Sequence, residues 1–277
     1  MGKKEMRMSR LVEIINSRGY IPIKEIAQLL HVSEMTVRRD LAAVEKSGLV
    51  KNVNGVLVSN SGNTVQVLDK EYDLLNETQV QNEVKKLIGR FAATMIVPGD
   101  CVIFDTGTTT EQIAMAIPPE MDFEALCFTR NTLERLCRLP HVNIALAGGY
   151  YYPRTQLFAG EDGVNFIRSI RANKLFISAA GIHEDLGISC ANSYEVPIKR
   201  AILQSAKQHI LVADSSKFGV VRSAYFCDLE DIDIVITDTG LSPEWRNILQ
   251  ERGVTLYRYK ARAHCTGIFS LRRFFHG

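Results

Sequence analysis

The 277-residue sequence predicts an α/β fold in two parts: an N-terminal winged helix-turn-helix and a larger, mainly parallel α/β domain. Two patterns predict this. Within the first 57 residues, three short amphipathic segments precede a hairpin signal. Beyond residue 100, short apolar runs alternate with helical segments, which is typical of parallel strands covered by helices on both faces.

The first two helices are predicted from apolar residues that recur with a period near 3.6. The first covers residues 5–18 and ends at Gly19. In the second, Pro22 stands where a first helical residue tolerates proline, and the segment stops at HVS, residues 31–33. Ser33 can cap a third helix, with Glu34 favourably placed at its positive end.

The third helix has one face that packs and one that is offered outward, at about 100° per residue. The first of these faces carries the stripe Val37, Leu41 and Val44, and the second carries Met35, Arg38, Arg39 and Ala42.

A wing is predicted after the third helix. Residues 49–60, LVKNVNGVLVSN, read as two short strands around Asn54-Gly55, a strong hairpin signal, with Lys51 on the first strand.

The tandem arginines suit a face that binds DNA. Guanidinium groups can pair with phosphates or bind guanine edges bidentately, while Ser33, Thr36 and the helix N-terminus can meet phosphate oxygens. Residues 1–57 hold ten Lys or Arg against six Asp or Glu, which adds attraction for a polyanion. The helix pattern alone favours equally a solvated face on a protein-interaction module, in which Asp40 and its neighbours pair with the arginines.

Composition indicates the class of protein. Hydrophobic residues make up 46% of the chain, and no window approaches the ~18 apolar residues of a membrane span, so we expect a soluble, cytoplasmic protein without a membrane partner. The six cysteines are scattered, without a CxxC pair or a histidine at metal-ligand spacing. We therefore expect reduced thiols, no metal site and no cofactor.

The chain after the winged helix-turn-helix of residues 1–57 divides by composition. Residues 58–69, rich in Ser, Asn, Thr and Gly, are the predicted linker, residues 70–258 the α/β domain and residues 259–277 a basic tail of unknown role. A helical stretch is expected over about 70–96. The expected strands are CVIFD, ALCFT, NIALAGG, LFISAAG, HILVAD and DIVITD, with helices at 109–117, 131–138, 194–207 and 243–252.

Polar loops at the strand ends predict a ligand site, because helix N-termini and backbone N–H groups point to that edge of a parallel sheet. DTGTTT, residues 105–110, follows a strand and precedes a helix. Gly107 lets the backbone approach an anion, although a well-capped turn also explains this loop alone. The other polar or glycine positions at strand ends are Gly148, Gly149, Gly181, Glu195, Asp214 and Lys217, of which the glycine pair is the weakest signal.

These motifs resemble one family. IKEIAQLLHVSEMTVRRDL resembles the DNA-binding head of DeoR-type bacterial transcriptional regulators. FDTGTTT, AGG, SAAGI, EVPIKRAI and ADSSKFG stand in the order of that family's effector domain, so the resemblance covers nearly the whole chain. The contacts expected with double-stranded operator DNA come from Ser33, Glu34, Met35, Thr36, Arg38, Arg39 and Lys51, the last where the family usually carries an arginine.

The effector domain is similar to ribose-5-phosphate isomerase and related sugar-phosphate enzymes. The similarity implies that Asp105, Glu195 and Lys217 bracket an open-chain sugar, while Asp214 either orients Lys217 or contacts the ligand. It also implies that the Gly/Thr loop holds phosphate. The complete set of expected effector contacts is Asp105, Gly107, Thr108, Thr109, Asn131, Gly148, Gly149, Gly181, Glu195 and Lys217.

We therefore expect a regulator rather than an enzyme: a repressor of sugar or nucleoside catabolism, acting as a homo-oligomer because two half-sites need two heads. A phosphorylated sugar, by resemblance deoxyribose 5-phosphate, is expected to release it from DNA. Activation instead of repression stays open. The alternative is a sugar-phosphate isomerase-like enzyme with an accessory helical head, since a carboxylate and a lysine beside a sugar carbonyl can transfer protons or form a Schiff base.

Overall fold

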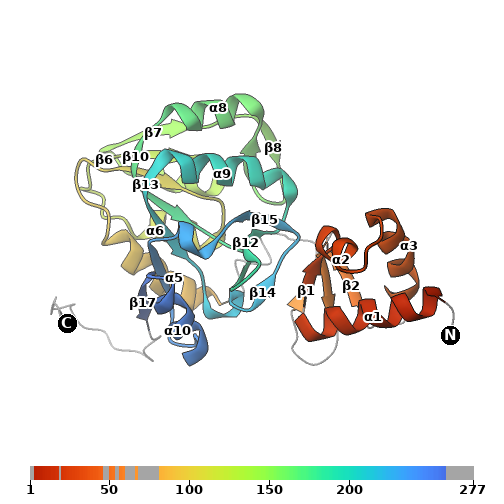
Figure 1. Cartoon of the computed structure of the whole chain (residues 1–277). Coiled ribbons are helices and arrows are strands. Elements are labelled where there is room, and N and C mark those ends of the chain that lie inside the picture. The colour runs from red at the N-terminus through yellow and green to blue at the C-terminus, as the bar shows by residue number, and fades with distance from the viewer. Residues whose placement is uncertain are drawn as a thin grey trace.

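The N-terminal part of the computed structural model is a winged helix-turn-helix, as predicted (Figure 1). The structure describes residues 3–18, 20–45, 50–53, 56–59, 66–67 and 81–259. The three helices are α1 (Lys3–Arg18), α2 (Ile23–Leu29) and α3 (Glu34–Glu45). An antiparallel sheet of order β1-β3-β2 combines β1 (Tyr20–Pro22), β2 (Val50–Val53) and β3 (Val56–Ser59).

The head has its own apolar core. Leu11 of α1, Ile26 of α2 and the predicted α3 stripe of Val37, Leu41 and Val44 are buried together. The hairpin is confirmed by the antiparallel pairing of β2 with β3, whereas its Asn54-Gly55 turn lies outside the described residues.

The prediction that Pro22 begins the second helix was wrong. Pro22 ends β1, where its Cα stands opposite that of Val56, and α2 begins at the next residue. Proline is tolerated there because β1 lies at the edge of the small sheet.

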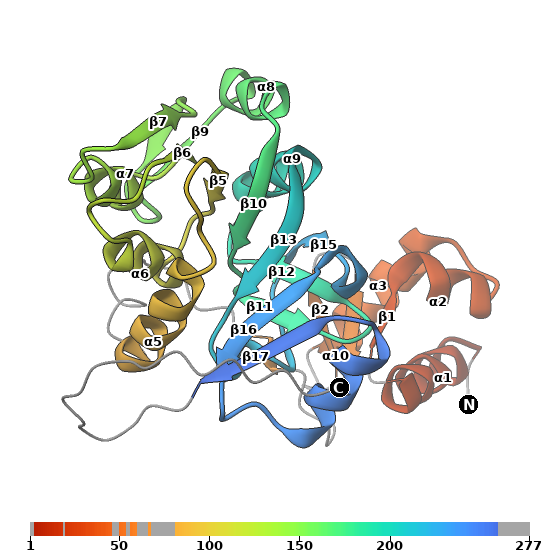
Figure 2. The ribbon, with the colours of Figure 1, turned by 90° about the vertical axis from the view of Figure 1, so that its left-hand side faces the viewer.

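The second part is built on a seven-stranded sheet in which every neighbouring pair is parallel (Figure 2). Its order is β17-β16-β13-β10-β5-β6-β7, so the order of the chain reverses between β5 and β10. Such a reversal opens a crevice at the carboxyl ends of the two strands. The strands are β5 (Cys101–Phe104), β6 (Phe123–Cys127), β7 (Val142–Leu146), β10 (Ala172–Ile177), β13 (Ala206–Val212), β16 (Ile234–Asp238) and β17 (Thr255–Tyr259).

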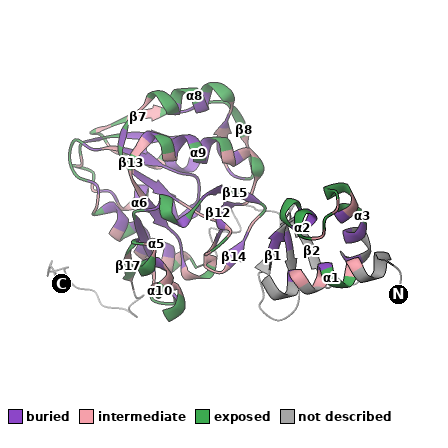
Figure 3. Ribbon diagram, in the orientation of Figure 1, coloured by how far each residue is buried: buried purple, intermediate pink, exposed green. Residues whose placement is uncertain are grey.

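Helices cover both faces of this sheet. Along β10, Phe176 packs into the core on the side of α5, α6 and α7, while Leu175 and Ile177 pack on the side of α8, α9 and α10. Burial on both faces explains why the strands read as continuous apolar runs (Figure 3). The helices are α5 (Asn82–Ala93), α6 (Thr108–Ala116), α7 (Arg130–Leu136), α8 (Glu161–Ser169), α9 (Val196–Ser205) and α10 (Pro243–Glu251).

All six predicted strands and the four predicted helices at 109–117, 131–138, 194–207 and 243–252 are confirmed, but several elements were not anticipated. The helix expected from about residue 70 begins, within the described residues, at Asn82. β17 was missed because it lies at an edge of the sheet and is only partly covered. Also missed were α8, the hairpin of β8 (Tyr150–Tyr152) and β9 (Leu157–Ala159), and the small sheet of β11 (Gly181–His183), β12 (Gly187–Cys190) and β15 (Ala224–Cys227).

Two short strands join the linker to the α/β domain: β4 (Gln66–Val67) runs parallel to β14 (Val220–Val221). Within the described residues, no helix combines the length and the apolar character needed to cross a membrane.

Candidate functional site

Helix α3 begins with a capped turn. The backbone N–H of Thr36 donates to Ser33 Oγ at 3.2 Å, and the hydroxyl oxygens of Ser33 and Thr36 lie 3.0 Å apart. Ser33 is therefore the N-cap, as predicted. Both hydroxyls keep free hydrogen-bonding capacity beside the helix N-terminus.

The outward face of α3 is cationic. Arg38 and Arg39 are exposed, as are Glu34 and Met35, the latter with 68% of its surface accessible. Asp40, which could have neutralised them, is buried and accepts a hydrogen bond from Arg7 Nε of α1 at 2.6 Å. Among the described side chains, none makes an ion pair with either arginine.

Around Lys51, the structure describes the backbone of the wing but not the side chains. That residue lies on β2, opposite Val58 of β3, and its side chain is outside the described part of the chain.

The second candidate site is a pocket at the carboxyl edge of the seven-stranded sheet, where the strand order reverses. Its walls come from three loops: Thr106–Thr109 after β5, Ser178–Ala180 after β10, and residues 213–217 after β13. Lys217 and Asp214 lie in the third of these loops, and Lys85 reaches the pocket from α5. The pocket therefore gathers cations, hydroxyls and a helix N-terminus at the position where open α/β sheets bind ligands.

Gly107 shapes the loop that begins α6. Its φ of 133° lies in a region that favours glycine, and a Cβ added there would stand 2.9 Å from Ser178 Oγ. The turn is closed by Thr110, whose hydroxyl donates to the Gly107 carbonyl at 2.9 Å. Thr108 and Thr109, the first residues of α6, line the pocket, and a helix N-terminus suits an anion.

We predict that Gly107→Ala destabilises the α/β domain by about 1–3 kcal/mol, because the substitution adds both backbone strain and a close contact. Gly148→Ala is the matched control: a Cβ there meets no heavy atom within 4 Å, so we expect a change within about 0.5 kcal/mol. Chemical denaturation of the two variants checks this, and equal losses would contradict it.

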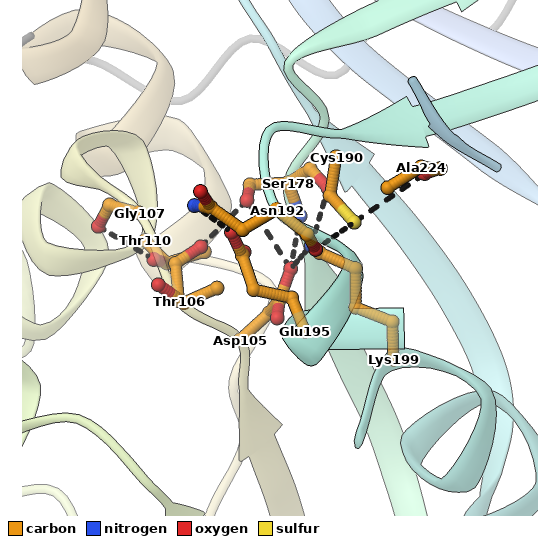
Figure 4. A network of polar contacts seen from close by, with 10 residues as sticks. All are labelled: Asp105, Thr106, Gly107, Thr110, Ser178, Cys190, Asn192, Glu195, Lys199 and Ala224. Atoms are coloured by element: carbon orange, nitrogen blue, oxygen red, sulfur yellow. Dashed lines mark hydrogen bonds and ion pairs between the residues drawn. The ribbon is translucent and has the colours of Figure 1, made fainter. Parts of the chain in front are cut away.

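Asp105 lies beneath the pocket, where it holds Lys199 (Figure 4). Its Oδ2 accepts from Lys199 Nζ at 2.5 Å and from the backbone N–H of Ser178 at 2.9 Å. Lys199 also donates to the Ser178 carbonyl at 2.9 Å. Burial alone would lower the pKa of Lys199, but the charge of Asp105 leads the effects that raise it, so the ammonium stays protonated.

Glu195 lies at the end of the 3₁₀ turn η1 (Ser193–Glu195), just before α9, and lines the pocket. It is buried, and Asn192 Nδ2 donates to its Oε1 at 2.7 Å. Burial raises the pKa of the Glu195 carboxyl, an effect that the charge of Lys199 opposes. A carboxyl group held in this way can bond a ligand hydroxyl.

The raised pKa of Glu195 predicts a pH effect on stability. The folded protein retains this proton at pH values where the unfolded chain has lost it, so the contribution of Glu195 to stability falls as pH rises above its ordinary pKa of 4.5 and through the folded value. Wild type should therefore lose melting temperature relative to Glu195→Gln across that window. A difference between the two proteins that is constant from pH 4 to 8 would contradict it.

Five of the predicted effector residues do not line the pocket: Asp105, which lies beneath it, and Asn131, Gly148, Gly149 and Gly181. Asn131 Nδ2 donates to Glu111 Oε2 at 3.1 Å. Gly149 allows close packing, since a Cβ there would lie 2.5 Å from the Ala159 carbonyl. Gly181 does the same against the carbonyl oxygen of Val220, also at 2.5 Å.

Sequence reasoning missed three polar residues of the pocket: Lys85, Ser178 and Lys199. Lys199 stands in EVPIKRAI, three residues before the buried Ile202 on the same face of α9, so its place on the inner face could have been noticed. Lys85 is only 2% exposed, yet nothing in the sequence separates it from Lys86 beside it.

Family models match both parts of the chain. The DeoR-like helix-turn-helix domain matches residues 7–63, and the DeoR C terminal sensor domain matches residues 80–239. The chain belongs to the DeoR family. The Deoxyribose operon repressor of Escherichia coli (strain K12) is 33% identical over 92% of this chain and 98% of its own length. The HTH-type transcriptional regulator IolR of Bacillus subtilis (strain 168) is 27% identical over 92% and 99%.

Likeness to solved structures is more distant for this DeoR-family chain. Ribose 5 phosphate isomerase A from Neisseria gonorrhoeae matches with a TM-score of 0.38 and 13% identity, over 50% of this chain and 54% of that one. The full-length sorbitol operon regulator SorC from Klebsiella pneumoniae matches with a TM-score of 0.34 and 14% identity, over 75% and 89%.

Proposed function

We propose that this protein is a transcriptional repressor of a sugar or nucleoside catabolic operon, released from its operator by a phosphorylated sugar. One observation carries the proposal: a pocket at the reversal of the strand order brings Lys85, Lys217 and the N-terminus of α6 together with Glu195. The first three suit a phosphate group and the carboxyl group suits a sugar hydroxyl.

Deoxyribose 5-phosphate is the first effector to test. The chain is 33% identical to the Deoxyribose operon repressor over nearly its whole length, and that relative's name points to deoxyribose metabolism. We propose Thr108, Thr109 and Lys217 as phosphate contacts and Glu195 as a sugar contact. Asp105 does not contact the ligand in this proposal but holds Lys199 and Ser178 in place, because its carboxylate already binds both residues.

The head contacts DNA through α3 in this proposal. Its exposed Arg38 and Arg39, with the capped N-terminus at Ser33, can enter a major groove and meet base edges and phosphates. A homo-oligomer supplies the two heads that a two-fold operator requires.

An isomerase-like activity is less well supported. Of the pocket lysines, Lys199 is unsuited to form a Schiff base, which needs a neutral amine, because Asp105 holds it protonated. The exposed arginine face of α3 has no part in such an activity.

Fluorescence anisotropy tests the proposal. A labelled fragment of the DNA upstream of the protein's own gene is titrated with protein, and the complex is then titrated with a panel of sugar phosphates at fixed salt. We expect specific binding that one compound reverses. Absence of DNA binding, with a melting temperature still raised by the same compounds, would instead favour the enzyme.

We predict that Arg39→Ala weakens operator binding by about 1–3 kcal/mol if the guanidinium reads a base, or reduces the salt slope by about one if it meets a phosphate. Arg10→Ala, which removes an exposed cation from α1, is the control for the charge of the head. Unchanged affinity and salt dependence in Arg39→Ala would remove that residue from the interface.

A further inference from the structure

The linker and the effector pocket are joined by the parallel pair of β4 and β14, in which Gln66 stands opposite Val220 and Val67 opposite Val221. We propose that this pair transmits ligand binding from the pocket to the DNA-binding head. The inference rests on the effector site proposed above and names the segment through which that site acts.

β14 is a direct continuation of the pocket wall. The 3₁₀ turn η2 (Ser215–Lys217) ends at the pocket residue Lys217, and β14 begins three residues later. Between them, Gly219 adopts a φ of 77° and donates its N–H to the Ile182 carbonyl at 2.8 Å. So short and constrained a turn leaves little slack, and a displacement of Lys217 toward a ligand therefore displaces β14.

A second pocket loop leads directly to a residue that packs against β14. Ala179 and Ala180 line the pocket, and Gly181 follows them directly. The backbone of Gly181 packs so closely on Val220 that a Cβ would stand 2.5 Å from its carbonyl oxygen. β14 is thus connected to two loops that line the pocket: it continues one of them and packs against the residue that follows the other, so a shift of either loop can displace it.

The next described helix after the linker also contributes to the pocket. Lys85 stands in the first turn of α5, the helix that follows the linker, and it lines the pocket. Before β4, six residues separate Ser59 of the wing strand from Gln66, so the Cα atoms of these two residues lie at most ~25 Å apart when the chain is extended. A phosphate group that engages Lys217 and Lys85 therefore acts beside β14, which pairs with the linker strand β4, and on α5, the next described helix along the chain.

A ligand shifts the equilibrium between two states of a protein only if it binds one state more tightly than the other. Transmission through the β4–β14 pair therefore requires that the pair be more stable in one of the two states, ligand-bound or ligand-free, than in the other. The pair suits this role because it is only two residues long on each side, and a pair of that size is marginal in stability. The competing interpretation is that the pair merely tethers the linker and has the same strength in both states.

The test compares Gln66→Pro/Val67→Pro, which removes both backbone N–H donors of β4, with Gln66→Ala/Val67→Ala, which keeps them. Operator affinity is measured by anisotropy with and without saturating deoxyribose 5-phosphate, or the compound of the panel that releases wild type. For each protein we compare the operator affinity without effector to that with effector. We expect this ratio to be the same in wild type and the alanine variant, and to fall to about one in the proline variant. Thermal shift should show that the proline variant still binds the compound.

A proline variant that keeps the wild-type ratio would overturn the inference and leave the proposed function intact. If no sugar phosphate alters the operator affinity of wild type, the proposed function itself fails and takes the inference with it. Should the proline variant lose operator binding altogether, Gly-Ser-Gly-Ser inserted between residues 63 and 64 lengthens the link to the wing and keeps β4. A ratio near one in that variant supports the inference, and the wild-type ratio overturns it.

Discussion

Lys199→Met is expected to lower the stability of the α/β domain by about 3–5 kcal/mol, a fall in melting temperature of roughly 6–20 °C. Methionine matches the length of the lysine stem but removes the partner of a carboxylate that is 0% exposed, Asp105. An uncompensated charge in such a position costs far more than the ion pair itself contributes, because water cannot replace the lost ammonium.

Two comparisons separate this effect from the general loss of a lysine. Lys174→Met breaks the pair with Asp100, whose side chains keep 17% and 8% of their surface, so water compensates in part and we expect a smaller loss. Lys199→Met combined with Asp105→Asn removes both charges, and we expect part of the stability to return. Thermal and urea denaturation of the three proteins measure these differences. Equal losses in the Lys199 and Lys174 variants would show that burial of the Asp105–Lys199 pair has no special cost.

The Asp105–Lys199 pair also marks where sequence reasoning stops. Asp105 was recognised at a strand end, but its partner Lys199 is 94 residues away and belongs to helix α9, so nothing local indicates the contact. Packing partners of this kind are set by the crossing of elements in the folded sheet. The same holds for Lys85, which faces the pocket only because α5 lies against α6.

Local patterns were more informative where one element alone decides the outcome. The α3 stripe of Val37, Leu41 and Val44 follows from helical periodicity, and the cap at Ser33 follows from residue type. Gly148 and Gly149 illustrate the opposite case. A glycine pair after a strand suits both a ligand loop and close backbone packing, and only the approach of Gly149 to Ala159 shows which of these the fold requires there.

Lys217→Met is expected to weaken the effector's ability to release the operator by about 10- to 100-fold, while affinity for DNA without effector stays as in wild type. The proposed contact is a charge-assisted hydrogen bond to phosphate, and the loss of such a bond costs about 1.5–3 kcal/mol. Lys217 follows the carboxyl end of β13, whereas the exposed Lys207 lies near the opposite end of the same strand and provides the matched control. Lys207→Met should release at the wild-type concentration of effector.

The same two variants show which part of the ligand Lys217 recognises. If it binds phosphate, Lys217→Met loses affinity for deoxyribose 5-phosphate and for inorganic phosphate alike, because both present the same oxygens. If it meets the sugar instead, affinity for inorganic phosphate is unchanged and the loss is confined to the sugar phosphate. Calorimetric titration of both ligands distinguishes these outcomes. A Lys217 variant that binds and responds to both ligands as wild type does would exclude this lysine from the site and leave Lys85 and the amides of α6 as the groups that hold the anion.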